Sequence, residues 1–337
     1  MDHTSRNILR YALGTTILVA ISSGFGWLLS YLLPILSLSF FASDSPPPKL
    51  KGGIIFLLAI WLSLYLALWF AKLFLGYPLL FFLLLNFILF LLFYTNSKYV
   101  TPLIRTWLII SFALVPIMGL ASQELILQVS LSMALDSFLA ILFTWLIFAF
   151  IPWKGKLPEP SPTPKNDPID DLRRFRSAGT NILIFAPVLL VFYLFNLQTS
   201  ILSMIFIALF LMQPNFGDSF KAGGAMILGN LAGGILSIIA YELLTIVPEF
   251  PFFLLIVFLT GLLLGKQVFS GKPAAPLFGM AFSTFLLILC STTSGDAEAG
   301  SKVWTRVFQI FLAVVYVVGV RQLINHYQKP KVITNAA

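Results

Sequence analysis

Apolar residues occur along the chain in long runs, separated by short stretches that contain proline, glycine or charged residues. Many runs approach the roughly 20 residues that an α-helix needs to cross the hydrocarbon core of a bilayer. The interruptions divide each half of the chain into six runs, so the pattern predicts about twelve helices, several of them short. We place them at 8–25, 27–43, 52–75, 78–95, 103–121, 126–151, 177–195, 199–213, 222–246, 251–269, 274–292 and 302–322.

The composition indicates the class of protein. Hydrophobic residues make up 59% of the chain and charged residues only 10%, whereas soluble domains carry about 25% charged residues. No soluble domain could bury so many apolar residues, and we therefore expect an all-α polytopic membrane protein. The lone cysteine, Cys290, excludes an intramolecular disulfide, and the two histidines lie near the termini. We expect neither a metal site in the core nor a cofactor.

A proline-rich polar segment separates the two sets of predicted helices. Such a sequence is extended and packs poorly, and it is too short here to hold a folded domain. The predicted organisation is a first membrane repeat at 1–151, a cytoplasmic linker at 152–176, a second membrane repeat at 177–325 and a cytoplasmic tail at 326–337.

Basic residues set the orientation, because cytoplasmic loops of membrane proteins are enriched in Lys and Arg. With both termini in the cytoplasm, only Lys72, Lys302 and Arg306 of the 21 Lys and Arg fall toward the outside, which leaves 18 inside. This bias also accounts for the net charge of +8, so we expect no nucleic-acid partner.

Two short motifs recur in both halves of the chain. RYALGT at 10–15 is similar to RSAGT at 176–180, and KGG at 51–53 is similar to KAGG at 221–224. Six runs per half give both halves the same orientation, which predicts parallel repeats related by an axis along the membrane normal. Chance similarity between apolar sequences is the alternative. Transporters built from such repeats carry substrate at the interface between them.

The segment QPNFGDSFK at 213–221, followed by Gly229-Asn230 and Gly233-Gly234, resembles the fusaric-acid-resistance (FUSC) superfamily. Members typically have a Gln-Pro-Thr-Phe-Gly-like turn, a serine, a basic residue and a helix with small residues. The resemblance is good over about 170–300. It is weaker in the first half, where SPPPK at 45–49 replaces the turn. The chain is similar to a branch of the superfamily that is catalogued as a domain of unknown function.

The resemblance implies a subunit of the bacterial inner membrane that exports small aromatic or other organic acids, commonly together with a periplasmic adaptor of the membrane-fusion type. We expect the proton gradient to power the export. Asn215 and Asn230 stand where threonine is common, and only the linker lies where many members carry a cytoplasmic domain. These departures leave the substrate and the energy coupling open.

Two alternative functions remain beside export. The chain could be a passive organic-anion channel, since plant malate channels are distantly similar to the superfamily, or a membrane scaffold that transports nothing. We do not expect an enzyme, because the sequence has no paired catalytic acids, no nucleophile beside a base and no His-Glu-x-x-His motif. The resemblance and a small-residue helix favour a dimer or larger homo-oligomer.

The turn that carries the resemblance is the first candidate functional feature. Gln213 precedes a proline that breaks the helix, and Asp218 is a natural N-cap residue. Lys221 then adds a positive charge to the N-terminus of the next helix, and such a cytoplasmic mouth attracts carboxylates. In the alternative interpretation Asp218 only caps the helix and Lys221 only follows the positive-inside rule.

The next helix carries small residues at a spacing of four. Ala225, Gly229 and Gly233 share one face, which allows a second helix to approach closely. This face is either a site of tight packing or a sliding seam between the repeats. Asn230 lies beside it and either finds a partner at membrane depth or lines a pore.

Two charged residues fall inside predicted spans. Asp136 is an acid in the sixth run. Exposing an ionisable side chain to lipid costs much free energy, so we expect Asp136 to face the interior of the bundle. Arg306 lies at a similar depth in the last run, and the repeat would place the two spans in equivalent positions. We hypothesise that the pair meets or faces one cavity, where Asp136 takes a proton in a coupling step. A static pair that fixes helix register is an equal alternative.

Overall fold

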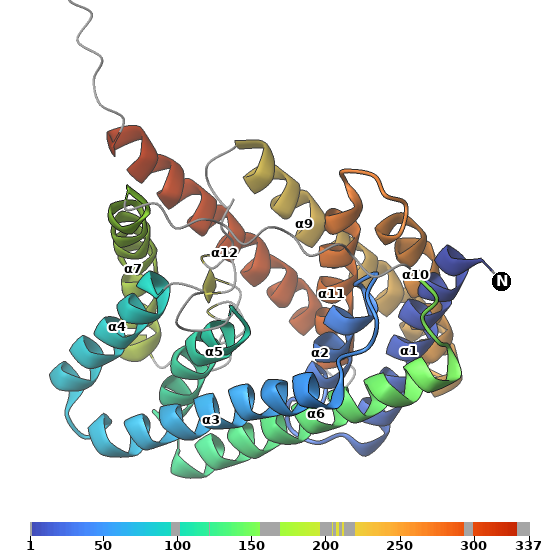
Figure 1. Ribbon diagram of the computed structural model, residues 1–337, viewed down its shortest axis with the longest axis horizontal. Coiled ribbons are helices and arrows are strands. Elements are labelled where there is room, and N and C mark those ends of the chain that lie inside the picture. The colour runs from blue at the N-terminus through green and yellow to red at the C-terminus, as the bar shows by residue number, and fades with distance from the viewer. Residues whose placement is uncertain are drawn as a thin grey trace, which may run out of the picture.

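The computed structural model describes residues 2–95, 102–120, 122–155, 169–195, 220–292 and 299–328, together with Met204, Ile207, Ala208 and Leu211. These residues form helices joined by turns, and none of them lies in a strand (Figure 1). The expected all-α class is therefore confirmed for the described part of the chain.

The helices follow the predicted runs in chain order. They are α1 (His3–Phe25), α2 (Leu32–Phe41), α3 (Leu50–Phe74), α4 (Pro78–Tyr94), α5 (Pro102–Met118), α6 (Gln123–Phe150), α7 (Ile169–Phe195), α9 (Phe220–Ile246), α10 (Phe250–Val268), α11 (Ala275–Thr292) and α12 (Ala299–Gln328). The predicted helix at 199–213 lies mostly outside the described residues, and the four residues described there are helical.

Local sequence explains several helix ends. The side chain of Ser122 accepts a hydrogen bond from the backbone N–H of Leu125 and caps α6. Proline stands in the first turn of α4 and of α10, where its missing N–H costs nothing. The start of α7 differs from the expectation: it begins at Ile169 and not at 177, so residues 169–176 extend the helix into the predicted linker.

Within the described residues, six helical segments are long and apolar enough to cross a membrane: His3–Phe25, Leu50–Phe74, Glu124–Phe150, Leu172–Phe195, Leu228–Ile246 and Phe250–Val268. The other apolar helices are shorter. Large apolar side chains lie on the outer faces of these helices, among them Leu131 and Leu263, which are each 70% exposed. A multi-pass membrane protein accounts for this exposed apolar surface, whereas the total of twelve spans stays a prediction.

The two halves of the chain interlock. α1 packs against α10, and α4 packs against α7, so that a helix of each half packs against a helix of the other half at both places. These two pairs lie at opposite ends of the molecule in Figure 1. Within the first half α3 packs against α5 and α6, and within the second half α9 packs against α11 and α12.

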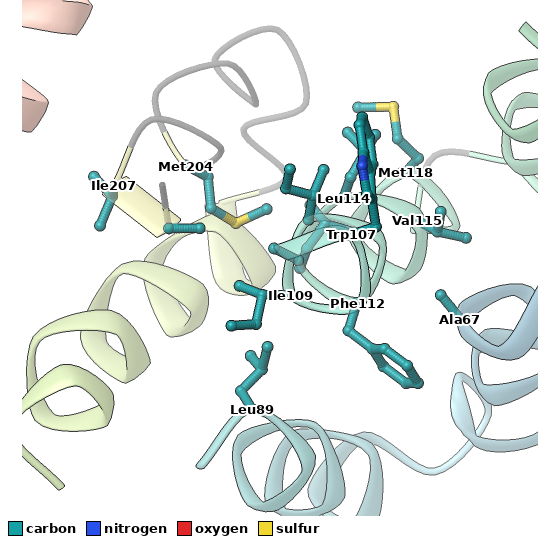
Figure 2. Close-up of a cluster of buried hydrophobic side chains, with 14 of the residues drawn as sticks. Ala67, Leu89, Trp107, Ile109, Phe112, Leu114, Val115, Met118, Met204 and Ile207 are labelled. Carbon is teal, nitrogen blue, oxygen red and sulfur yellow. The ribbon is translucent and has the colours of Figure 1, made fainter. Parts of the chain in front are cut away.

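Two clusters of buried apolar side chains form the core, and both draw on both halves. The larger cluster centres on α5. Figure 2 shows its residues together with Ala67 of α3, Leu89 of α4, and Met204 and Ile207 from the segment between α7 and α9. The second cluster joins α1, α2 and α6 to α10 and α11. In the part of the chain that the structure describes, the two halves thus share their cores.

Candidate functional site

Asp136 is fully buried in α6, in the interior of the bundle. The indole Nε1 of Trp27 donates a hydrogen bond of 2.9 Å to its Oδ1. Its second oxygen, Oδ2, is also buried and accepts no hydrogen bond from any described residue. Desolvation of an acid is costly without hydrogen bonds to both oxygens, so this carboxyl is held from one side only.

Trp27 reaches Asp136 because the chain turns sharply after α1. Gly26 ends that helix with a φ of 60°, and its N–H donates to the carbonyl oxygen of Ser22. Such left-handed conformations suit glycine at helix C-termini. Leu29 also has a φ of 60°, which is rare for a residue with a side chain. This turn brings the chain back toward α6 and places the indole against Asp136.

The residue after Asp136 is also held by a tryptophan, from α3. The Nε1 of Trp61 lies 3.2 Å from the Oγ of Ser137 and 3.3 Å from the carbonyl oxygen of Ala134, and donates to both. Two indole donors, from the turn after α1 and from α3, therefore fix the middle of α6.

A second polar cluster surrounds Arg10 of α1, which is fully buried. Its Nη2 donates to Oδ1 of Asn7 at 2.8 Å, and Nδ2 of Asn7 donates to Oδ1 of Asp44 at 2.9 Å. The same carboxylate oxygen accepts a hydrogen bond from Nε1 of Trp153 at 3.0 Å and lies 3.3 Å from Nε2 of His3. This Arg10 cluster connects α1, the loop before α3 and the residues that follow α6.

The buried guanidinium of Arg10 has donor groups that its described hydrogen bond does not use. It lies 4.0 Å from the ring centroid of Phe148, in cation–π geometry. Its Nε and Nη1 are buried and donate to no described residue. Because a buried cation without all its hydrogen bonds is costly, Arg10 is a candidate functional residue as well as a structural one.

Asn230 of α9 is buried and faces α11. The Oγ1 of Thr284 donates a hydrogen bond of 2.7 Å to its Oδ1. A side-chain hydrogen bond between two helices holds them together at membrane depth. The described geometry therefore gives Asn230 a partner on the neighbouring helix.

Gly229 and Gly233 lie where α9 crosses α11 closely. A Cβ on Gly229 would lie 3.0 Å from the carbonyl oxygen of Leu277, and a Cβ on Gly233 would collide with the carbonyl oxygen of Ala281. At Gly233 glycine is what allows the two backbones to come this near, whereas a Cβ at Gly229 would make a tight contact. In this structure the small-residue face is a packed contact, and whether it slides stays a prediction.

The structure leaves several predicted site residues undescribed. Gln213 and Asp218 lie outside the described residues. Lys221 and Ala225 belong to α9 and Arg306 to α12, but their side chains lie outside the described part of the structure. The cytoplasmic mouth therefore stays a prediction.

Whether Asp136 and Arg306 meet stays a prediction, because the side chain of Arg306 lies outside the described part of the structure. α6 packs against α1, α2, α3 and α5, and α12 packs against α7, α9 and α11. The hydrogen bond described for Asp136 comes from Trp27. A shared cavity between the two charges remains a prediction.

Trp27 and the Arg10 cluster were missed by the sequence interpretation. Arg10 was counted among the basic residues that set the orientation and as the first residue of a repeated motif, and Trp27 was placed inside a helix. A signal for Trp27 existed, because Gly24 and Gly26 directly precede it and mark a turn. No pattern pointed to Asp44 as the centre of a cluster.

Two family models match the chain, one in each half. Residues 7–147 match a family described as a protein of unknown function, DUF2955. Residues 184–320 match a family described as fusaric acid resistance protein-like. The boundaries of the two matches lie on either side of the proline-rich segment. No curated protein and no solved structure matches the chain. The chain is therefore similar to the fusaric-acid-resistance-like (FUSC-like) family over its second half and to a family of unknown function over its first half, which supports the resemblance found in the sequence.

Proposed function

We propose that the chain is a proton-driven exporter of small organic acids in the bacterial inner membrane, working with a periplasmic adaptor. The family match supports a membrane transporter of the efflux type. The apolar helices support a multi-pass membrane protein. The substrate class, the proton coupling, the adaptor and the cytoplasmic termini are parts of the proposal.

The buried carboxyl of Asp136 is the observation that carries the proton coupling. Ionisable groups inside a membrane are costly, and they frequently mark proton relays. The Oδ2 of Asp136, which accepts no described hydrogen bond, is the atom that takes the proton. Trp27 can donate to Oδ1 whether or not the carboxyl is protonated, because an indole is a donor only. The indole thus holds the side chain in place while its charge changes.

Helix packing supports the two parallel repeats of the proposal. The contacts of α3 with α5 and α6 correspond to those of α9 with α11 and α12. The contact of α1 with α10 corresponds to that of α7 with α4. Such an exchange relates the halves by a two-fold axis, along which transporters carry substrate. α6 and α12, which carry Asp136 and Arg306, are then equivalent.

Efflux measurements test the proposal. Cells that express the chain with its native neighbours are loaded with hydroxybenzoates, and export is followed before and after a protonophore. We expect gradient-dependent export that Asp136→Asn abolishes, because an amide cannot carry the proton. Glu249→Gln removes an exposed acid and serves as the matched control, for which export should not change.

The possible results separate the functions. Export that continues downhill without the gradient would indicate a passive channel. Export by Asp136→Asn at the wild-type rate, at equal expression, would contradict the proton role. No flux of any anion from well-expressed protein with an adaptor present would favour the scaffold.

A further inference from the structure

A cavity of about 520 Å³ lies between α7 and α12, and Ile207 lies on its wall. Its volume is in the range of pockets that hold small ligands. Among the described residues that line it, none carries a charge, and Gln309 and Tyr316 are the polar ones. An apolar occupant fits this lining, whereas an ion would lose its hydration without gaining a partner.

The cavity opens on the outer surface of the helix bundle. The lining residues Val191, Leu312 and Val315 are 44%, 55% and 41% exposed. α7 is apolar enough to span the membrane, so this surface faces hydrocarbon. The occupant of the cavity therefore enters sideways from the bilayer.

A proline forms part of the wall. Pro187 cannot donate to the carbonyl oxygen of Leu183, one turn earlier in α7. The hydroxyl of Tyr316 on α12 donates to the adjacent carbonyl oxygen, that of Ile184, at 2.9 Å. A side chain from a neighbouring helix thus bonds the backbone one residue after the carbonyl that the proline leaves without its helical donor. The cavity lies beside this contact, which ties α7 to α12.

Two arginines extend the same face of α7 toward its N-terminus. Arg173 and Arg176 are exposed. Pro187 follows Arg176 by 11 residues and Val191 follows Arg173 by 18, close to three and five turns at about 3.6 residues per turn. All four residues therefore share one face. Eleven residues rise about 16 Å, and one leaflet of hydrocarbon is about 15 Å thick.

We propose that the cavity and the adjoining face of α7 bind an anionic phospholipid, with its phosphate at Arg173 and Arg176 and one acyl chain in the cavity. The distance along α7 matches the depth of one leaflet, so a chain anchored at the arginines ends at the cavity. Arginine near the membrane surface attracts anionic lipids. The site is independent of any transport activity, and the lipid bridges α7 and α12 where Pro187 interrupts the helix.

Native mass spectrometry of the full chain in mild detergent tests the site. Phosphatidylglycerol and phosphatidylethanolamine with matched acyl chains are added separately. We expect phosphatidylglycerol to be retained more strongly. Arg173→Gln with Arg176→Gln should weaken its retention roughly fivefold for each arginine. Lys51→Gln removes an exposed charge on α3 and is the matched control.

A second variant tests the acyl chain. Ala313→Trp fills the cavity, so retention of phosphatidylglycerol should fall, whereas Leu131→Trp on an exposed face of α6 should leave it unchanged. Equal retention of the two lipids, or equal effects of the arginine and Lys51 substitutions, would overturn the proposal. Glycerol phosphate binding as tightly as the lipid would show an anion site without a chain. A disulfide-linked dimer of Leu312→Cys, made with Cys290→Ser, would place a second copy over the cavity instead.

Discussion

Replacing Gly233 by alanine should force α9 and α11 apart. The new Cβ would collide with the carbonyl oxygen of Ala281 and would lie 2.9 Å from the Cβ of Thr284. The oxygen belongs to the backbone of α11 and cannot rotate away, so the helices must separate. Separation also stretches the hydrogen bond between Thr284 and Asn230, which is 2.7 Å long.

The magnitude follows from two opposing contributions. Alanine stabilises a helix interior by about 0.5 to 1 kcal/mol relative to glycine, and overpacking a tight contact costs about 1 to 3 kcal/mol. The difference between the two ranges is a loss of up to about 2.5 kcal/mol in the free energy of unfolding for Gly233→Ala. At Gly229 the nearest atom is 3.0 Å away, and the two contributions should nearly cancel. At Gly279 of α11 nothing lies within 4 Å of the new Cβ, so alanine there should stabilise.

Thermal unfolding of the three variants in one detergent, followed by tryptophan fluorescence, ranks their stabilities. We expect the midpoint of Gly233→Ala to be lowest, that of Gly229→Ala intermediate and that of Gly279→Ala highest. For a chain of this size each kcal/mol shifts the midpoint by roughly 2 °C, so the extremes should differ by a few degrees. Equal midpoints for the variants at 233 and 279 would refute the close approach of α9 and α11.

Three further predictions concern buried polar groups. Arg10→Gln should destabilise the protein by about 1 to 3 kcal/mol, because it breaks the buried cluster and leaves partners unpaired, and thermal unfolding measures the loss. Trp27→Phe removes the described donor to Asp136 and should lower gradient-driven export in the efflux assay at unchanged membrane expression. Ser63 and Ser111 share a buried hydrogen bond of 2.9 Å between α3 and α5, so a double-mutant cycle with alanine should give a coupling of about 1 kcal/mol.

Each of these predictions has a control or a contradicting result. Lys49→Gln removes an exposed cation and should leave the unfolding midpoint unchanged, so an equal effect of Arg10→Gln would contradict the cluster. Wild-type export by Trp27→Phe would show that the indole does not position the carboxyl. Additive effects in the serine cycle would show that the two hydroxyls do not interact.

The positions of most helices could be predicted from the sequence, because the signals that set them are local. Apolar run length, proline and capping residues act within a few residues of each helix end. α4, α10 and α11 lie within a residue or so of their predicted bounds. Larger differences occur at the starts of α1, α2 and α7, which were predicted at 8, 27 and 177, and at the end of α12, which was predicted at 322. At α2 the overlooked local signal was the glycine turn before Trp27.

The candidate site was predicted only in part. Asp136 was found, since an acid inside an apolar run is conspicuous, and its burial follows from its cost in lipid. Its described partner was not found, because Trp27 is 109 residues away in the chain. Arg10 was visible as a basic residue, but nothing local distinguishes a buried arginine from one that sets the orientation.

The sequence by itself determined the membrane class and the positions of most helices, whereas the tertiary structure decided which helices touch. In a soluble protein the apolar face of a helix marks its contact surface. In a bilayer both the lipid and the protein interior are apolar, so hydropathy does not distinguish the two faces. The contacts of α1 with α10 and of α4 with α7, and the hydrogen bond from Trp27 to Asp136, depend on close packing and on polar partners distant in sequence. These appear only when the whole chain is folded.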